Sequence, residues 1–138
     1  MKALEIIGLA ILGIIVGSGI NMGLVYTGGF IFPDLSEINI PDSETGLVDA
    51  TNAPLKYFLF PFLAHAIGTL VGAAISSKLS KLSNGFASSM IVGVFFLAGG
   101  FTIQLIIIAP DWFNYLDLIV CYIPMAWLGW KIGKRNVY

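Results

Sequence analysis

The sequence predicts an all-α membrane protein, a bundle of four antiparallel transmembrane helices. Of its 138 residues, 57% are hydrophobic and only 11% are charged, and the mean hydropathy is +0.90. Apolar runs longer than ~18 residues fill most of the chain. Basic residues flank these runs at one end and acidic residues at the other. A water-soluble core does not account for such a composition, so we expect a single membrane domain over residues 1–138.

Four apolar runs are each near or above the ~20 residues that a helix needs to cross a bilayer. Lipid offers backbone groups no partner, so each run should be helical. The first run continues too far for a cleaved signal peptide. Two short links, 78–85 and 110–111, make the last three helices antiparallel neighbours. The predicted spans cover residues 3–30, 57–77, 86–109 and 112–132.

The longest connection, residues 31–56, is rich in proline and in acidic residues. Positive residues set the orientation, because Lys and Arg are enriched in cytoplasmic segments. Six basic residues flank the spans on the face opposite this acidic loop, whereas Lys56 is the one cation on the loop side. The sequence therefore predicts cytoplasmic termini and an outer acidic loop. The six flanking residues are Lys2, Lys78, Lys81, Lys131, Lys134 and Arg135.

Small residues recur at four-residue spacing in three of the spans. This spacing lets helix backbones approach closely, and such packing supplies much of the association energy in lipid. We expect close helix contacts either inside the bundle or between copies of the chain, and the first span carries two such faces. The glycines are Gly13, Gly17, Gly19 and Gly23 in the first span, Gly68 and Gly72 in the second, and Gly129 and Gly133 in the fourth.

Polar side chains inside the spans are energetically costly, so their depth is informative. Counted from the outer ends at ~1.5 Å per residue, Asn21 and His65 lie about 14 Å deep, and Tyr26, Gln104 and Asp117 about 7 to 9 Å deep. Helical periodicity places His65 and Gln104 on the glycine-bearing sides of their helices. The sequence thus predicts a buried polar cluster of these five residues in the outer half of the bundle.

Two titratable residues of this cluster each allow two interpretations. His65 is either a neutral imidazole that ties helices together through Asn21 or a backbone carbonyl, or a group that titrates or binds a ligand. Asp117 either reaches the outer interface beside Trp112, or pairs with His65 or Gln104. The sequence leaves both choices open.

No catalytic residue, cofactor or metal site is predicted. Cys121 is the only cysteine, which excludes an internal disulfide. Cys121, Met125, His65 and Met22 have comparable depth and are ligand types that Cu(I) prefers, but no spacing motif supports such a site. The acidic loop lacks the spaced ligand pattern of a calcium loop.

Three stretches carry a resemblance to known proteins: Ala64 to Gly72, the turn Pro110-Asp111-Trp112-Phe113, and Ile123 to Gly129. Through them the chain resembles a group of small, uncharacterised four-helix bacterial inner-membrane proteins. The resemblance implies a multi-pass protein of the bacterial inner membrane and transfers no site. Small multidrug transporters are a poorer match, because they require a carboxylate in the first helix where this chain has Gly13 and Gly17.

In the absence of a catalytic constellation, the sequence favours a non-catalytic membrane protein. Such a chain would act as an accessory subunit or scaffold of a membrane complex or homo-oligomer. The alternative is a small oligomeric transporter or channel that uses the buried polar cluster, with Pro124 opening a gap in the backbone of the fourth span. Lipid and other membrane subunits are the expected partners. The net charge of -1 indicates no nucleic-acid surface.

Overall fold

The computed structural model describes residues 2–34, 37, 40–81 and 84–134, so the basic residue Arg135 lies outside the described residues. Within that part of the chain, four helical segments are long and apolar enough to cross a membrane. The prediction of a helical chain with four candidate spans is therefore confirmed. The segments are Lys2–Ile31, Leu55–Leu79, Phe86–Gln104 and Asp111–Gly133.

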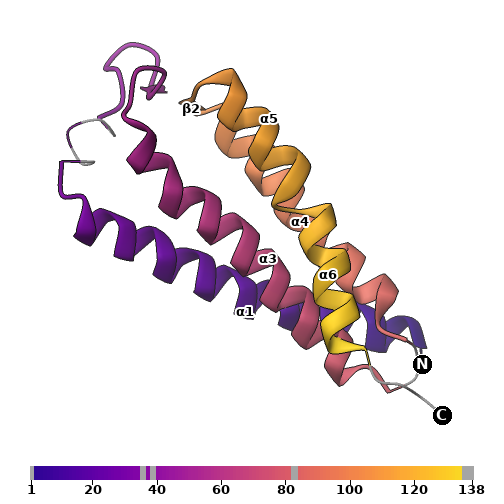
Figure 1. Ribbon diagram of the computed structural model, residues 1–138. Helices are drawn as coiled ribbons and strands as arrows, with labels where there is room; N and C mark the ends of the chain where they lie inside the picture. The colour runs from indigo at the N-terminus through magenta and orange to yellow at the C-terminus, as the bar shows by residue number, and fades with distance from the viewer. Residues whose placement is uncertain (1, 35–36, 38–39, 82–83, 135–138) are drawn as a thin grey trace.

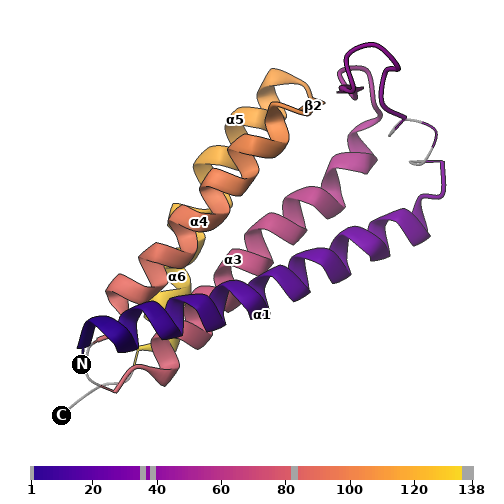
Figure 2. The same cartoon turned by 180° about the vertical axis from the view of Figure 1, so that it is seen from behind.

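The first two spans lie against each other, and the last two form a second pair (Figure 1). The two pairs converge at the end where the chain begins and diverge at the end of the long loop, in the front view and from behind (Figure 2). The helices are α1 (Lys2–Ile31), α3 (Leu59–Leu79, preceded by the 3-10 turn η1, Leu55–Phe58), α4 (Phe86–Gln104), α5 (Asp111–Val120) and α6 (Ile123–Gly133).

At the converging end, glycines bring the backbones of α1 and α3 into contact. A Cβ added to Gly13 would lie 2.5 Å from the carbonyl oxygen of Gly72, and one added to Gly17 would lie 2.6 Å from that of Gly68. Helix α6 packs on the other side of α3, where a Cβ on Gly129 would lie 2.9 Å from the side chain of Ala73. Larger residues do not fit at these positions without a shift of the backbone, so this half of the bundle is closed.

The same end also joins the connection between α3 and α4 to α1 and α6. The backbone N–H of Lys81 donates to the carboxylate of Glu5, and Trp130 Nε1 donates to the carbonyl oxygen of Asn84 over 2.9 Å. At the opposite end, the rings of Phe32 and Tyr57 meet edge to face at 5.6 Å. These contacts join neighbouring segments at both ends of the bundle.

The third span is shorter than the sequence predicts, since α4 ends at Gln104 and does not continue to Ala109. Residues beyond it form a two-residue strand, β2 (Ile107–Ile108), which pairs in parallel with β1 (Val48–Asp49) of the long loop. The backbone N–H of Val48 donates to the Ile106 carbonyl oxygen at 3.0 Å. Pairing with a distant segment thus ends the helix and attaches the loop to the connection between α4 and α5.

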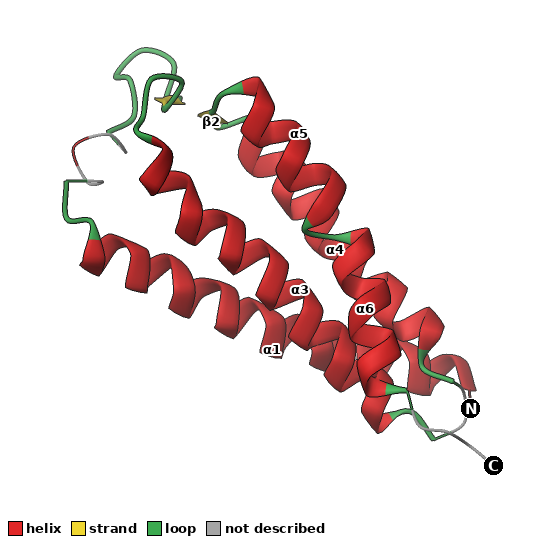
Figure 3. Ribbon diagram, in the orientation of Figure 1, coloured by secondary structure: helices red, strands yellow, loops and turns green. Residues whose placement is uncertain are grey.

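The fourth span consists of two helices, and the break between them is visible as a loop segment in Figure 3. Pro124 has no N–H, so the carbonyl of Val120 loses its helical donor. Tyr122 adopts φ -115° and ψ -80°, outside the helical range, and its carbonyl accepts from Ala126 N–H at 2.8 Å as α6 begins. The break lies at Cys121 and Tyr122 and rotates α6 relative to α5.

Candidate functional site

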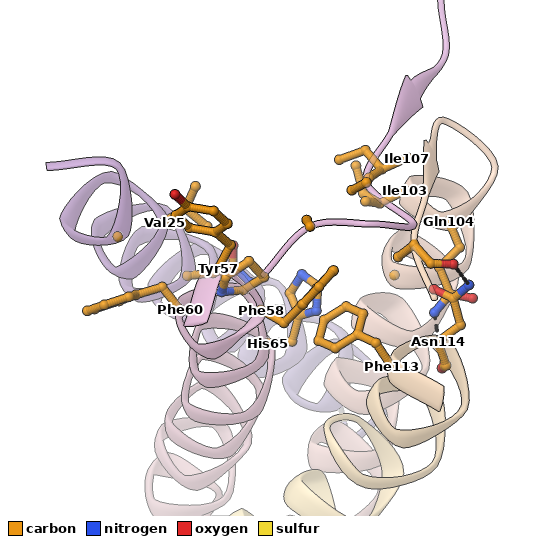
Figure 4. A pocket seen from close by; sticks show the side chains of 17 residues that line it. Val25, Tyr57, Phe58, Phe60, His65, Ile103, Gln104, Ile107, Phe113 and Asn114 are labelled. Carbon is orange, nitrogen blue, oxygen red and sulfur yellow. Dashed lines mark hydrogen bonds between the residues drawn. The ribbon is translucent and has the colours of Figure 1, made fainter. Parts of the chain in front are cut away.

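A cavity of ≈ 300 Å³ lies between the diverging ends of the two helix pairs (Figure 4). All four spans contribute to its wall, the fourth through α5 and not α6, and the long loop contributes Ala50 and Ala53. Aromatic and aliphatic side chains form most of the surface. The polar side chains of the wall include Asn21, His65, Gln104 and Asn114.

Behind the cavity wall, His65 belongs to a buried hydrogen-bonded network with two residues of the fourth span. His65 Nδ1 lies 2.8 Å from Asp117 Oδ1 and 2.9 Å from the hydroxyl oxygen of Tyr122. Tyr122 donates its hydroxyl proton to Asp117 Oδ2 over 2.7 Å. Asp117 and Tyr122 are each only 1% exposed. We call these three residues the His65 network.

The donor and acceptor roles of the His65 ring follow from the charge of Asp117. With Asp117 ionised, Tyr122 donates its one hydroxyl proton to Oδ2, and Oδ1 receives a hydrogen bond from Nδ1–H of His65. The other ring nitrogen, Nε2, is then an acceptor in the neutral imidazole and a donor in the imidazolium. The side chain of His65 is 18% exposed and lines the cavity, while its Nδ1 edge is covered by Asp117 and Tyr122. Nε2 therefore belongs to the edge that faces the cavity.

The network also explains how a carboxyl group is tolerated at this depth. Asp117 follows the buried Phe113 by four positions, so both lie on the inward face of α5. Two hydrogen bonds satisfy the Asp117 carboxylate, whereas an unpaired carboxylate in the interior would be strongly destabilising. Of the two alternatives that the sequence left open, the structure shows Asp117 buried and paired with His65, not at the interface beside Trp112.

The predicted polar cluster is assembled in part. Asn21, His65 and Gln104 line one cavity, and Asp117 lies directly behind His65. The placement of Tyr26 in the cluster is wrong, because its side chain is 74% exposed on the outward face of α1. Tyr26 stands five positions after Asn21, and about 100° per residue turns it about 140° away from the cavity.

The expected hydrogen bond between His65 and Asn21 is likewise replaced, because the imidazole bonds Asp117 and Tyr122. Depth alone places Asn21 beside His65, but the carboxylate is the stronger hydrogen-bond partner. Both residues still face the same cavity.

Two residues of the site are absent from the sequence prediction. Tyr122 stands five positions after Asp117, so a regular helix would point the two side chains apart; Pro124 was the signal that the helix is broken. Tyr122 also packs against Gly100, which leaves room for its hydroxyl group beside His65. Asn114 stands three positions before Asp117, on a neighbouring part of the same face.

Asn114 ties α5 to the end of α4 and to the turn that follows it. Its Nδ2 donates to the carbonyl oxygen of Ala109 at 3.2 Å, and its backbone carbonyl oxygen accepts from Gln104 Nε2 at 3.2 Å. Its side-chain oxygen Oδ1 is buried and has no hydrogen-bond partner among the described residues. An unpaired buried acceptor is uncommon in folded proteins.

The acidic loop is shaped by carboxylates that accept hydrogen bonds from their own turns. Asp42 Oδ1 accepts from the N–H of Thr45 at 2.8 Å and from that of Glu44 at 3.0 Å, and Asp49 Oδ1 accepts from the Thr51 hydroxyl at 2.6 Å. These hydrogen bonds hold the pKa of Asp42 and of Asp49 below the ordinary value. The two carboxylates thus fix the path of the loop toward the cavity.

Among the described residues that line the cavity there is no Asp, Glu, Lys or Arg. Among the described residues, no group of three or more His, Cys, Asp or Glu side chains is arranged to hold a metal ion. Of the four residue types that Cu(I) prefers, Met22 is 57% exposed, and the Cys121 thiol donates to the Phe62 carbonyl oxygen at 3.6 Å. Comparison of the chain with protein-family models, with curated proteins and with solved structures finds no match in any of the three.

Proposed function

We propose that the protein is a small transporter of the bacterial inner membrane that takes up a solute from the outer side and couples its movement to a proton on His65. The observation that carries the proposal is the position of His65 between the cavity and the buried carboxylate of Asp117. One edge of the imidazole is held in place by the Nδ1 hydrogen bonds. The other edge is available to a solute or a proton in the cavity.

Two features of the bundle support alternating access. The cavity is present only in the diverging half, whereas Gly13 and Gly17 pack directly on α3 in the other half. The fourth span is interrupted at Cys121 and Tyr122, at the level of the His65 network. Interrupted helices at the substrate site are a recurrent property of transporters, because two short helices can move separately.

The orientation within the membrane is part of the proposal. Lys2, Lys78, Lys81, Lys131 and Lys134 flank the converging end, and among the described residues Lys56 alone flanks the end that carries the acidic loop. The positive-inside rule therefore favours cytoplasmic termini. In this orientation the cavity opens toward the outer side.

Native mass spectrometry of the protein, solubilised from its own membrane, tests whether the cavity holds a small molecule. Ala53 lines the cavity, so Ala53→Phe should fill it and remove small-molecule adducts. Ala87→Phe is the matched control, because Ala87 is exposed on α4 at the converging end. Adducts should be present in the unmodified protein and in the control variant. Equal adducts in all three proteins would exclude the cavity as the binding site.

A second candidate function, that of an accessory subunit or a homo-oligomer, is favoured by a different observation. A Cβ added to Gly19 or Gly23 would meet nothing within 4 Å, so this glycine face of α1 is not used inside the bundle. The mass of the detergent-solubilised particle from the native membrane tests it. A particle much heavier than the 14.8 kDa chain that dissociates in Gly23→Leu would support this role. A monomer in both proteins would exclude it.

A further inference from the structure

We infer that the cavity takes an uncharged, largely apolar molecule that carries a hydroxyl group, and that this hydroxyl donates its proton to Nε2 of His65. The inference rests on the proposed function, since it names the class of ligand for the same cavity. It also implies that the ligand and a proton compete for one lone pair. Three properties of the cavity lead to this class: its charge, its walls and the kind of polar atoms it presents.

Charge excludes ionic ligands. In the described part of the chain no Asp, Glu, Lys or Arg lines the cavity, so an ionised ligand would find no opposite charge on these walls. The nearest carboxylate, Asp117, already accepts hydrogen bonds on both oxygens from His65 and Tyr122. Transfer of an unpaired charge from water into such a site is strongly unfavourable. The ligand is therefore uncharged.

The walls fix the character of the ligand body. Side chains from α1, α3, α4, α5 and the connection after α4 surround the space with apolar surface, and Figure 4 shows several of them turned toward one another. A volume of ≈ 300 Å³ is at the lower end of the range for small-molecule sites. A compact apolar body fits this space. The apolar contacts include Val25, Phe58, Phe60, Ile103, Ile107 and Phe113.

The polar atoms of the site determine which group the ligand must bring. Nε2 of neutral His65 is an acceptor, and no donor is paired with it in the described part of the chain. This acceptor calls for a donor, and a hydroxyl supplies one without the positive charge of an amine. The side-chain amide of Asn21 lines the same cavity and can donate to the hydroxyl oxygen.

Competition with a proton follows from the same atom. When His65 takes a second proton, Nε2 becomes a donor and no longer accepts the ligand hydroxyl. The titratable groups packed near His65 come from the fourth span: Asp117 and Tyr122 bond to it, and Cys121 lies between them in the chain. Helices α1 and α4 present the uncharged Asn21 and Gln104. A proton on Nε2 and the ligand hydroxyl therefore exclude each other.

Three matched probes test this ligand class by equilibrium dialysis against the protein in nanodiscs, with empty nanodiscs as the blank. They are 1-naphthol, naphthalene and 1-naphthoate, which share one apolar body and differ in the donor and the charge. The unmodified protein should bind 1-naphthol in a saturable manner and about tenfold more tightly than either other probe.

Variants assign the effect to His65. In His65→Asn the amide nitrogen replaces Nδ1 toward Asp117 while Nε2 is lost, so the preference for 1-naphthol over naphthalene should disappear. Tyr26→Phe removes an exposed hydroxyl outside the cavity and should leave the preference unchanged. Equal binding of 1-naphthol and naphthalene, or tighter binding of 1-naphthoate, would overturn the ligand class. If Ala53→Phe still removes native adducts in that case, the cavity remains the proposed binding site and only its ligand is wrong.

Discussion

Tyr122 donates a hydrogen bond to Asp117 over 2.7 Å, although the two residues stand five positions apart in one membrane span. In a continuous helix their side chains would point about 140° apart. The break before α6 turns Tyr122 back toward α5, and Gly100 leaves space for its ring. The geometry of the His65 network therefore depends on a defect in the helix.

Removal of the Tyr122 hydroxyl should destabilise the protein. Tyr122→Phe leaves Asp117 Oδ2 without a donor in the interior, which should lower the free energy of unfolding by about 1 to 3 kcal/mol. Thermal unfolding in detergent measures the effect. Tyr26→Phe is the matched control and should change stability by less than about 0.5 kcal/mol, because Tyr26 is exposed. Identical melting of the two variants would mean that Tyr122 does not support Asp117.

Two substitutions of His65 should differ although both introduce a side-chain amide. The His65 network uses Nδ1, and the shorter Asn side chain places its nitrogen near that atom, whereas Gln places it near Nε2. We expect His65→Asn to be more stable than His65→Gln by about 1 to 3 kcal/mol, since only the second leaves Asp117 Oδ1 unpaired. Chemical denaturation compares the two. The opposite order of stability would show that Nε2, not Nδ1, makes the structural hydrogen bond.

Glycines that look alike in the sequence should respond differently to a large side chain. A Cβ on Gly68 would lie 2.8 Å from the Gly17 carbonyl oxygen, whereas a Cβ on Gly19 would meet nothing within 4 Å. Gly68→Leu should therefore lower the free energy of unfolding by about 1 to 3 kcal/mol. Gly19→Leu should leave the melting temperature of the monomer unchanged or raise it, because Leu has the higher helix propensity. Equal losses in both variants would contradict the packing of α1 on α3.

Labelling with an impermeant thiol reagent tests the orientation. Ser43 is exposed in the acidic loop and Lys134 is exposed after α6. Ser43→Cys should react in intact cells, and Lys134→Cys only after the membrane is permeabilised. The native Cys121 is buried, so the unmodified chain should give a low background. Reaction of Lys134→Cys in intact cells would reverse the proposed topology.

Much of the helical framework follows from hydropathy, because apolar runs in lipid have no alternative to the helix. The convergence of Asn21, His65 and Gln104 on one cavity was predictable from depth together with glycine periodicity. Depth alone misplaces Tyr26, because depth does not specify the direction of a side chain around the helix axis. Tyr122 could not be placed, since its direction is set by backbone torsions at the break and not by regular periodicity.

The end of α4 illustrates a second kind of limit. Ile107 and Ile108 are apolar and continue the third run, so hydropathy extends the helix through them. Their pairing with Val48 and Asp49 depends on a segment far away in the sequence, and local patterns carry no information about it. Elements that form through long-range contacts are the ones that sequence patterns miss.

The parallel pair β1 and β2 also links the two helix pairs at the end of the bundle where they diverge. It ties the loop that leads into α3 to the turn between α4 and α5, through hydrogen bonds such as those from Val48 N–H to Ile106 and from Ala50 N–H to Ile108. Each such bond contributes about 0.5 to 1.5 kcal/mol net. Widening the mouth therefore requires only the loss of these few backbone hydrogen bonds, whereas the glycine contacts at the converging end need not change.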